Sequence, residues 1–85
     1  MNEKEEKLLE QILKQIINNL CKEKLGLSLD ELPLKYKLSG RTKTIIKNNL
    51  KSCRLDNIWE LSEILKMNFH EIIQLIEKEW DSINK

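Results

Sequence analysis

Residues 55–72 of the chain read LDNIWELSEILKMNFHEI, and this stretch decides the fold class. Apolar side chains recur every three or four residues on both sides of Met67-Asn68, which is typical of two amphipathic helices joined by a turn. The pattern predicts one helix that opens at Leu55-Asp56-Asn57 and a last helix that starts near Phe69. The core side of the first of these two helices is expected to consist of Ile58, Trp59, Leu61, Ile64 and Leu65.

A longer pattern of the same kind occupies the N-terminal part of the chain. It predicts a helix over about residues 3–24, with glutamates in the first turn and lysines in the last, as the helix dipole favours. Gly26 follows as the natural stop, because glycine readily adopts the left-handed conformation that ends many helices. The apolar stripe of this helix comprises Leu8, Leu9, Ile12, Leu13, Ile16, Ile17, Leu20 and Cys21.

A short helix is predicted after this stop. The stretch Ser28-Leu29-Asp30-Glu31 matches a capping box, in which the serine and the glutamate each bond to the other's backbone amide. The helix would cover about residues 29–36. Pro33 lies inside it, lacks an amide donor and crowds the preceding turn, so we expect either a kink there or a shorter helix.

A second short helix is predicted after Ser39, which is a suitable N-cap residue. This helix carries Arg41 and its neighbours, and it either ends at Asn48-Asn49 or continues through Leu50. No segment alternates strictly between apolar and polar residues, so no sheet is expected. The sequence therefore predicts an all-α domain of five helices, with residues 1–85 forming a single unit.

The composition narrows the class of protein. Charged residues make up 34% and hydrophobic residues 40% of the 85 positions, as in an ordinary globular domain. No apolar run approaches the roughly 20 residues of a membrane helix, and the N-terminus lacks a signal-peptide pattern, so we expect a cytoplasmic protein. Cys21 and Cys53 are far apart and belong to no CxxC pair, so both are expected to be free, buried or half-buried thiols.

Positive charge is concentrated in one segment. The stretch from Pro33 to Leu55 contains seven basic residues and no acidic residue, whereas the chain as a whole carries only +1 and the remaining residues therefore sum to −6. Such an island is the electrostatic footprint of a phosphate-binding surface, although a solvated lysine-rich helix face is the alternative. The seven residues are Lys35, Lys37, Arg41, Lys43, Lys47, Lys51 and Arg54.

A long helix, the stretch Gly26-Leu27-Ser28, two short helices and then residues 55–72 follow in an order that resembles the Cro/C1 (Xre) family of helix-turn-helix proteins. The resemblance covers roughly Leu9 to Leu75. It implies a lambda-repressor-like five-helix domain that binds operator DNA, usually as a dimer, with the second short helix in the major groove. Members of similar length include phage repressors and restriction–modification controller proteins.

The chain departs from this family pattern at four positions. Pro33 stands where the family usually has a small residue, Lys37 where it has glycine, and Leu29 where glutamine is common. The fourth is Lys43, near which the family has an apolar residue. Two arrangements would accommodate this lysine: its stem lies over the core, or the helix register brings Ile45 and Ile46 into the core instead.

The resemblance also implies which residues contact DNA. Arg41 is the expected base reader, because its planar guanidinium can pair bidentately with guanine, and Lys43 and Thr44 come next. Lysines flanking the helix and the free amides near Ser28 and Ser39 are expected to hold phosphates. The expected DNA-binding residues are Ser28, Lys37, Ser39, Gly40, Arg41, Thr42, Lys43, Thr44, Lys47 and Lys51.

The last helix has an apolar stripe that extends past the usual end of the family core. We interpret residues 69–85 as a dimerisation helix, and the expected partners are therefore double-stranded DNA and a second copy of the chain. Packing within the chain against Leu9, Ile12 and Ile16 is the alternative. The stripe consists of Phe69, Ile72, Ile73, Ile76, Trp80 and Ile83.

Catalytic and metal-binding patterns are weak. His70 is the single histidine, no nucleophile–base pair can be argued around it, and a zinc site with Cys21 and Cys53 would need a fourth ligand. We expect no enzyme, cofactor, metal or small-molecule substrate, and we interpret Glu60, Glu63, Glu71 and Glu77 as solvent-facing. The sequence predicts a sequence-specific DNA-binding transcriptional regulator. The runner-up is a helical protein–protein interaction module, such as an anti-repressor or regulatory partner, that has lost DNA binding.

Overall fold

The computed structural model describes residues 2–48 and 53–83 of the chain, and every element in these ranges is helical. None of the helices in this part is long and apolar enough to cross a membrane. The predicted all-α class is therefore confirmed for the part of the chain that the structure describes. The elements are α1 (Glu3–Leu25), the 3₁₀ helix η1 (Leu29–Glu31), α2 (Leu32–Lys35), α3 (Gly40–Asn48), α4 (Leu55–Leu65) and α5 (Phe69–Ile83).

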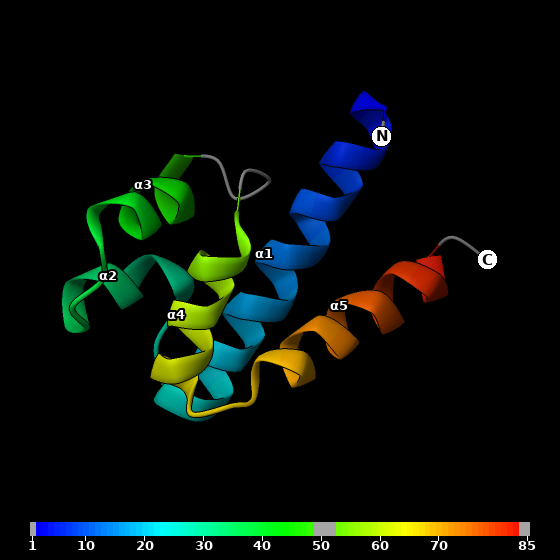
Figure 1. The fold of residues 1–85 in the computed structure, drawn as a ribbon. Coiled ribbons are helices and arrows are strands. Elements are labelled where there is room, and N and C mark those ends of the chain that lie inside the picture. Colours follow the sequence, from blue (N-terminus) through cyan, green and yellow to red (C-terminus); the bar gives the residue numbers. More distant parts are fainter. Residues whose placement is uncertain (1, 49–52, 84–85) are drawn as a thin grey trace.

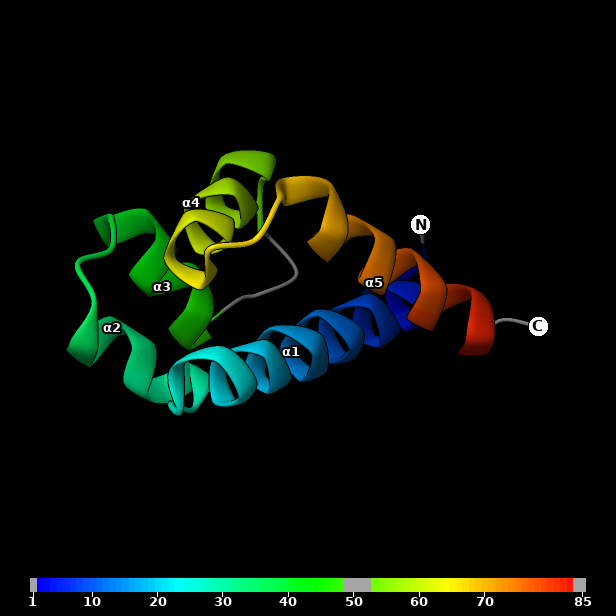
Figure 2. The same ribbon diagram turned by 90° about the horizontal axis from the view of Figure 1, so that it is seen from below.

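The helices form an elongated domain with principal extents of 37 × 22 × 20 Å. Helix α1 runs along its length, and α4 and α5 both pack against α1 (Figure 1). Helices α2 and α3 lie together at one end of the molecule, opposite the end at which both termini emerge (Figure 2). The functional candidates on α3 are thus well separated from the C-terminal helix.

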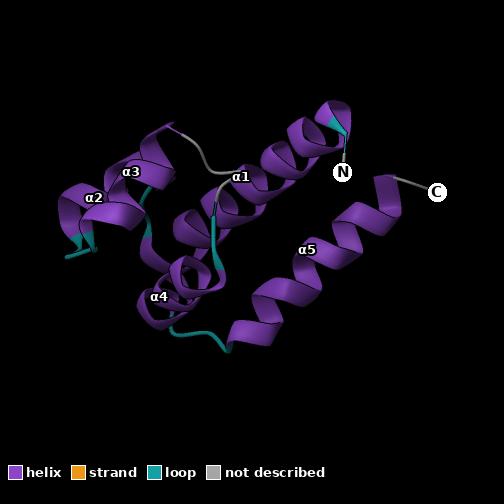
Figure 3. Cartoon of the chain, turned by 45° about the horizontal axis from the view of Figure 1, so that its top comes forward, coloured by secondary structure: helices purple, strands orange, loops and turns teal. Residues whose placement is uncertain are grey.

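One apolar core holds these helices together. Its fully buried side chains include Ile17 on α1, Leu32 on α2, Leu61 on α4 and Ile72 on α5. Each such side chain contributes about 1.5–3 kcal/mol when it leaves water, so these contacts account for much of the fold's stability. A cartoon coloured by secondary structure shows helices and loops alone in the described residues (Figure 3).

Helix α1 has well-formed ends. The Asn2 side chain accepts a hydrogen bond from the Glu5 amide at 2.8 Å, and the Glu5 carboxylate accepts one from the Asn2 amide at 3.3 Å. At the other end Gly26 adopts φ 70°, ψ 22°, the left-handed conformation that avoids a steric penalty only in glycine. The predicted helix and its stop at Gly26 are confirmed.

The first short helix is divided, as the proline suggested. Ser28 and Glu31 form the predicted capping box, and the Glu31 carboxylate accepts from the Ser28 amide at 3.3 Å and from its hydroxyl at 3.0 Å. The 3₁₀ turn η1 then gives way to α2, which has Pro33 in its first turn. A missing amide donor is harmless at that position, because first-turn amides have no partner within the helix.

The helix after Ser39 also begins as predicted. The Ser39 hydroxyl accepts a hydrogen bond from the Thr42 amide at 3.2 Å, so Ser39 caps α3. Ile45 and Ile46 are buried and Lys43 is exposed, which is the second of the two arrangements that the sequence left open. The expected helix end at Asn49 or Leu50 lies outside the described residues.

The predicted core side of α4 is partly wrong. Ile58, Leu61 and Leu65 are buried as expected, but 56% of Trp59 is exposed. Two small polar residues, Asn57 and Ser62, take up the rest of the buried side of α4, and Trp59 lies outside it. Its ring lies 5.5 Å from that of Phe69, at 36° between the planes.

Most residues of the apolar stripe of α5 pack against the core of the same chain. Ile72 is completely buried in the core, and Phe69, Ile73 and Ile76 pack against the core as partly buried residues. Trp80 is half-buried, whereas 48% of Ile83 is exposed. This is a correction to the expected dimer surface: packing against α1, the alternative considered above, accounts for much of the stripe.

Candidate nucleic-acid interface

Helix α3 presents its cations to solvent and its apolar residues to the core. The side chains of Arg41, Lys43 and Lys47 are exposed, whereas Ile45 and Ile46 are buried. None of these three cations forms an ion pair with any of the residues that the structure describes. The helix therefore carries positive charge on one side that is open to a large anionic partner.

Three further expected contact residues remain at the surface near this helix. Lys37 and Gly40 are exposed in and just after the loop that precedes α3. Thr44 is exposed as well, and its hydroxyl donates to the Gly40 carbonyl at 3.0 Å. Lys51, the last expected phosphate contact, lies outside the described residues.

Thr42 was expected to contact DNA, and the structure contradicts this prediction. Only 1% of the residue is exposed, because its side chain points toward α4. The Thr42 hydroxyl donates to Glu60 Oε1 at 2.7 Å and accepts from Asn57 Nδ2 at 3.0 Å. Thr42 therefore fixes α3 to α4 and is unavailable to a ligand.

The expected phosphate sites at the helix starts are also occupied by the chain itself. The Ser39 amide donates to Glu60 Oε2 at 2.8 Å, and its hydroxyl lies 3.0 Å from Glu60 Oε1. At Ser28 the Glu31 carboxylate fills the corresponding position. A carboxylate supplies the negative charge that a helix N-terminus attracts, so neither amide is free for a phosphate.

The sequence suggested that Glu60 faces solvent, but in the structure its carboxylate is bonded to Ser39 and Thr42 and has a structural role. Its burial raises the pKa of the carboxyl, but the hydrogen bonds from Thr42 and Ser39 outweigh burial and hold the pKa below its ordinary value. Glu60 is ionised at neutral pH and places a fixed negative charge at the start of α3. Attraction of a polyanion then depends on the lysine and arginine side chains of the exposed face.

Sequence reasoning missed this group because its members come from separate segments. Thr42 and Glu60 are 18 positions apart, and nothing in the spacing indicates that they meet. One signal was present: Asn57 lies one turn before Leu61, on the side of α4 that carries Ile58, Leu61 and Leu65. A polar residue in such a position needs a buried hydrogen-bond partner, which here is Thr42.

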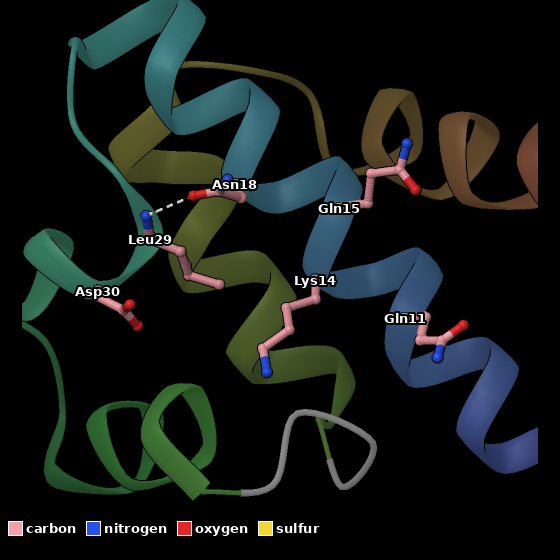
Figure 4. A pocket seen from close by; sticks show the side chains of 6 residues that line it. All are labelled: Gln11, Lys14, Gln15, Asn18, Leu29 and Asp30. Carbon is pink, nitrogen blue, oxygen red and sulfur yellow. Dashed lines mark hydrogen bonds between the residues drawn. The ribbon is translucent and has the colours of Figure 1, made fainter.

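A hollow of about 380 Å³ lies between α1 and η1 (Figure 4). Within it, Asn18 Oδ1 accepts a hydrogen bond from the Leu29 amide at 2.8 Å and so attaches η1 to α1. Its charged residues, Lys14 and Asp30, are exposed, so the hollow offers no desolvated acid or base of the kind that catalysis uses. The lining residues are Gln11, Lys14, Gln15, Asn18, Leu29 and Asp30.

The two thiols and the histidine of the chain show no sign of a reactive or metal-binding arrangement in the described residues. Burial raises the pKa of Cys21, and burial together with the negative charge of Asp56 raises the pKa of Cys53 to about 11. Both thiols therefore stay protonated and poorly nucleophilic at neutral pH. His70 is exposed at the start of α5, and the described part of the chain brings no three His, Cys, Asp or Glu side chains together as a metal site.

Comparison with known proteins adds no relative. No protein-family model matches the chain, and no curated protein or solved structure matches it significantly.

Proposed function

We propose that the protein binds double-stranded DNA through the exposed face of α3 and acts as a sequence-specific transcriptional regulator of the Cro/C1 type. One observation carries the proposal: α3 has an exposed cationic side and a buried side, and the buried side attaches it to the rest of the domain. A short helix, a loop and a capped second helix precede α4, which is the order that the helix-turn-helix resemblance implies.

The exposed residues divide into two roles. Arg41 lies in the first turn of α3, the part of a recognition helix that reaches base edges, and it can pair bidentately with guanine. Lys37 and Lys47 flank that turn and are suited to phosphates, which set affinity and register without reading sequence. Because Glu60 already holds the Ser39 amide, backbone contacts at the helix start contribute little.

The direct test is a titration of the protein with random genomic duplex fragments at two salt concentrations. Binding through lysine and arginine releases counterions from DNA, so affinity should fall steeply as salt rises. No binding at low salt, or binding that does not change with salt, would contradict the proposal.

A protein–protein interaction module is the second candidate function, and the position of Leu34 favours it. This residue is 82% exposed, and it lines a groove together with Lys43 and Lys47. DNA phosphates gain nothing from an exposed leucine. A failure of the salt titration would therefore favour this second function.

We also propose that the DNA-bound form is a homodimer that uses the part of α5 left at the surface. Leu75 and Ile83 are 39% and 48% exposed. A two-fold dimer would place its two recognition helices about 34 Å apart, on successive major grooves. Sedimentation equilibrium of the wild type and of Ile83→Gln tests this: a wild type that stays monomeric at about 10–100 μM, the range of a weak dimer, would contradict it.

A further inference from the structure

A groove of about 570 Å³ runs between α2 and α3, on the same side of the domain as the cationic face. Its apolar part is built around Leu34, which at 82% has the largest exposed fraction of any large hydrophobic residue in the described ranges. Lys43 and Lys47 line the α3 side, one helical turn apart. The lining residues are Asp30, Pro33, Leu34, Lys43, Ile46 and Lys47.

This combination suits a ligand with apolar side chains and negative charge together. Leu34 and Pro33 offer apolar contact, and the two lysines offer charge. A duplex would use the lysines and leave Leu34 in water, whereas an amphipathic helix with leucine-type anchors and carboxylates would use both. Helices of that kind bind grooves through anchors spaced by one turn.

The charge distribution of the chain favours an acidic ligand in particular. No acidic residue occurs between Pro33 and Leu55, while the residues outside this stretch sum to −6. An acidic segment is therefore repelled by the rest of the surface and attracted to this groove. Asp30 lies at the η1 side, so the ligand's carboxylates face α3.

We propose that the groove between α2 and α3 binds an acidic amphipathic helix of a partner protein. This goes beyond the DNA-binding proposal, in which the contacts around Leu34 have no role, and it names the partner class for the interaction module considered above. The two are connected at one point: Lys43 and Lys47 are shared, so a bound helix and a bound duplex exclude each other. That consequence alone rests on the proposed function.

The test uses a fluorescent, helix-forming peptide of about 15 residues with leucines spaced by one turn on one side and glutamates elsewhere. Fluorescence anisotropy measures its affinity for the wild type and for Leu34→Gln. Leu55→Gln is the matched control, because Leu55 is 70% exposed on α4, outside the groove. Both substitutions are at exposed positions and leave the fold intact.

We expect the peptide to bind the wild type and Leu55→Gln equally and Leu34→Gln about tenfold more weakly, equivalent to about 1.4 kcal/mol. Replacing the peptide's glutamates with glutamines should also weaken binding. No binding, equal weakening by both leucine substitutions, or undiminished binding of the neutral peptide would each overturn the proposal.

A parallel titration with duplex DNA separates this proposal from the proposed function. Leu34→Gln should leave duplex affinity unchanged, and unlabelled peptide should displace bound duplex. If no duplex binds, the peptide measurements still decide the groove proposal by themselves. A peptide that displaces duplex but is unaffected by Leu34→Gln would show charge attraction alone and would overturn the groove proposal.

Discussion

Helices α3 and α5 are attached to the domain in different ways. Helix α5 packs on α1 through apolar area, with Ile72 and Ile17 completely buried. Helix α3 also buries Ile45 and Ile46, but its N-terminal half is joined to α4 by hydrogen bonds that converge on Glu60. Apolar contact is non-directional, whereas hydrogen bonds demand defined angles. The orientation of the candidate recognition helix α3 therefore depends on a few polar atoms, whereas the position of α5 depends on the apolar surface that it buries.

The largest expected effect is a loss of stability when the buried apolar contact of α5 is truncated. Ile72→Ala should lower the free energy of unfolding by about 2–5 kcal/mol, because it leaves a cavity at a completely buried position. Urea denaturation measures the change. Ile83→Ala is the control, since Ile83 is half-exposed on the same helix and should change stability far less. Equal effects of the two substitutions would mean that α5 is not held by its buried side.

On the polar side, Thr42→Val should lower the free energy of unfolding by about 1–3 kcal/mol. The substitution leaves Asn57 Nδ2 without its acceptor in a buried position and removes a donor to Glu60. Thr44→Val is the matched control on the same helix, and it should change stability by about 0.5 kcal/mol or less because Thr44 is exposed. If denaturation curves show no difference between the two variants, the polar group does not anchor α3.

Substitutions on the exposed side of α3 should change DNA affinity and leave the free energy of unfolding nearly unchanged. Arg41→Ala is expected to weaken binding to the best duplex site by about 1–3 kcal/mol and to relax preference at one base pair. Lys47→Ala should weaken binding to all sequences about equally, because phosphate contacts carry no sequence information. Competition binding against a randomised duplex pool measures both. Losses of the same kind in the two variants would refute the division of roles.

The smallest expected effect is the pH dependence of the stability that Glu60 provides. The folded-state pKa of Glu60 lies below its unfolded value of about 4.3, so its hydrogen bonds stabilise the fold above that value and are lost as pH falls through the folded pKa. At pH 7, Glu60→Gln should be less stable than the wild type by about 1 kcal/mol or less, because the carboxylate is partly solvated. The difference in unfolding free energy should shrink as the pH falls below about 4. A difference that stays constant down to acid pH would mean that the ionised carboxylate is not what holds α3.

The sequence predicted the helices better than the contacts of their side chains. Periodicity and caps are local, so the stop at Gly26, the cap at Ser39 and the start of α5 at Phe69 could be read directly. Which side of a helix meets another element is not local. The apolar character of Trp59 predicts a core position, and the position of Thr42 in the chain predicts a surface contact. The burial of Trp59 depends on how α4 is rotated and that of Thr42 on how α3 is rotated.

Binding of DNA to the exposed face of α3 can be tested with two matched double variants. The double variants Lys43→Gln/Lys47→Gln and Lys22→Gln/Lys24→Gln each remove two exposed positive charges and have the same net charge, but the second pair lies at the end of α1. Duplex affinity is measured for both at several salt concentrations. We expect the α3 variant to bind duplex more weakly and the magnitude of its slope of log affinity against log salt to fall by about two, while the α1 variant behaves as the wild type. Equal losses in both variants would show that only net charge matters and would contradict the claim.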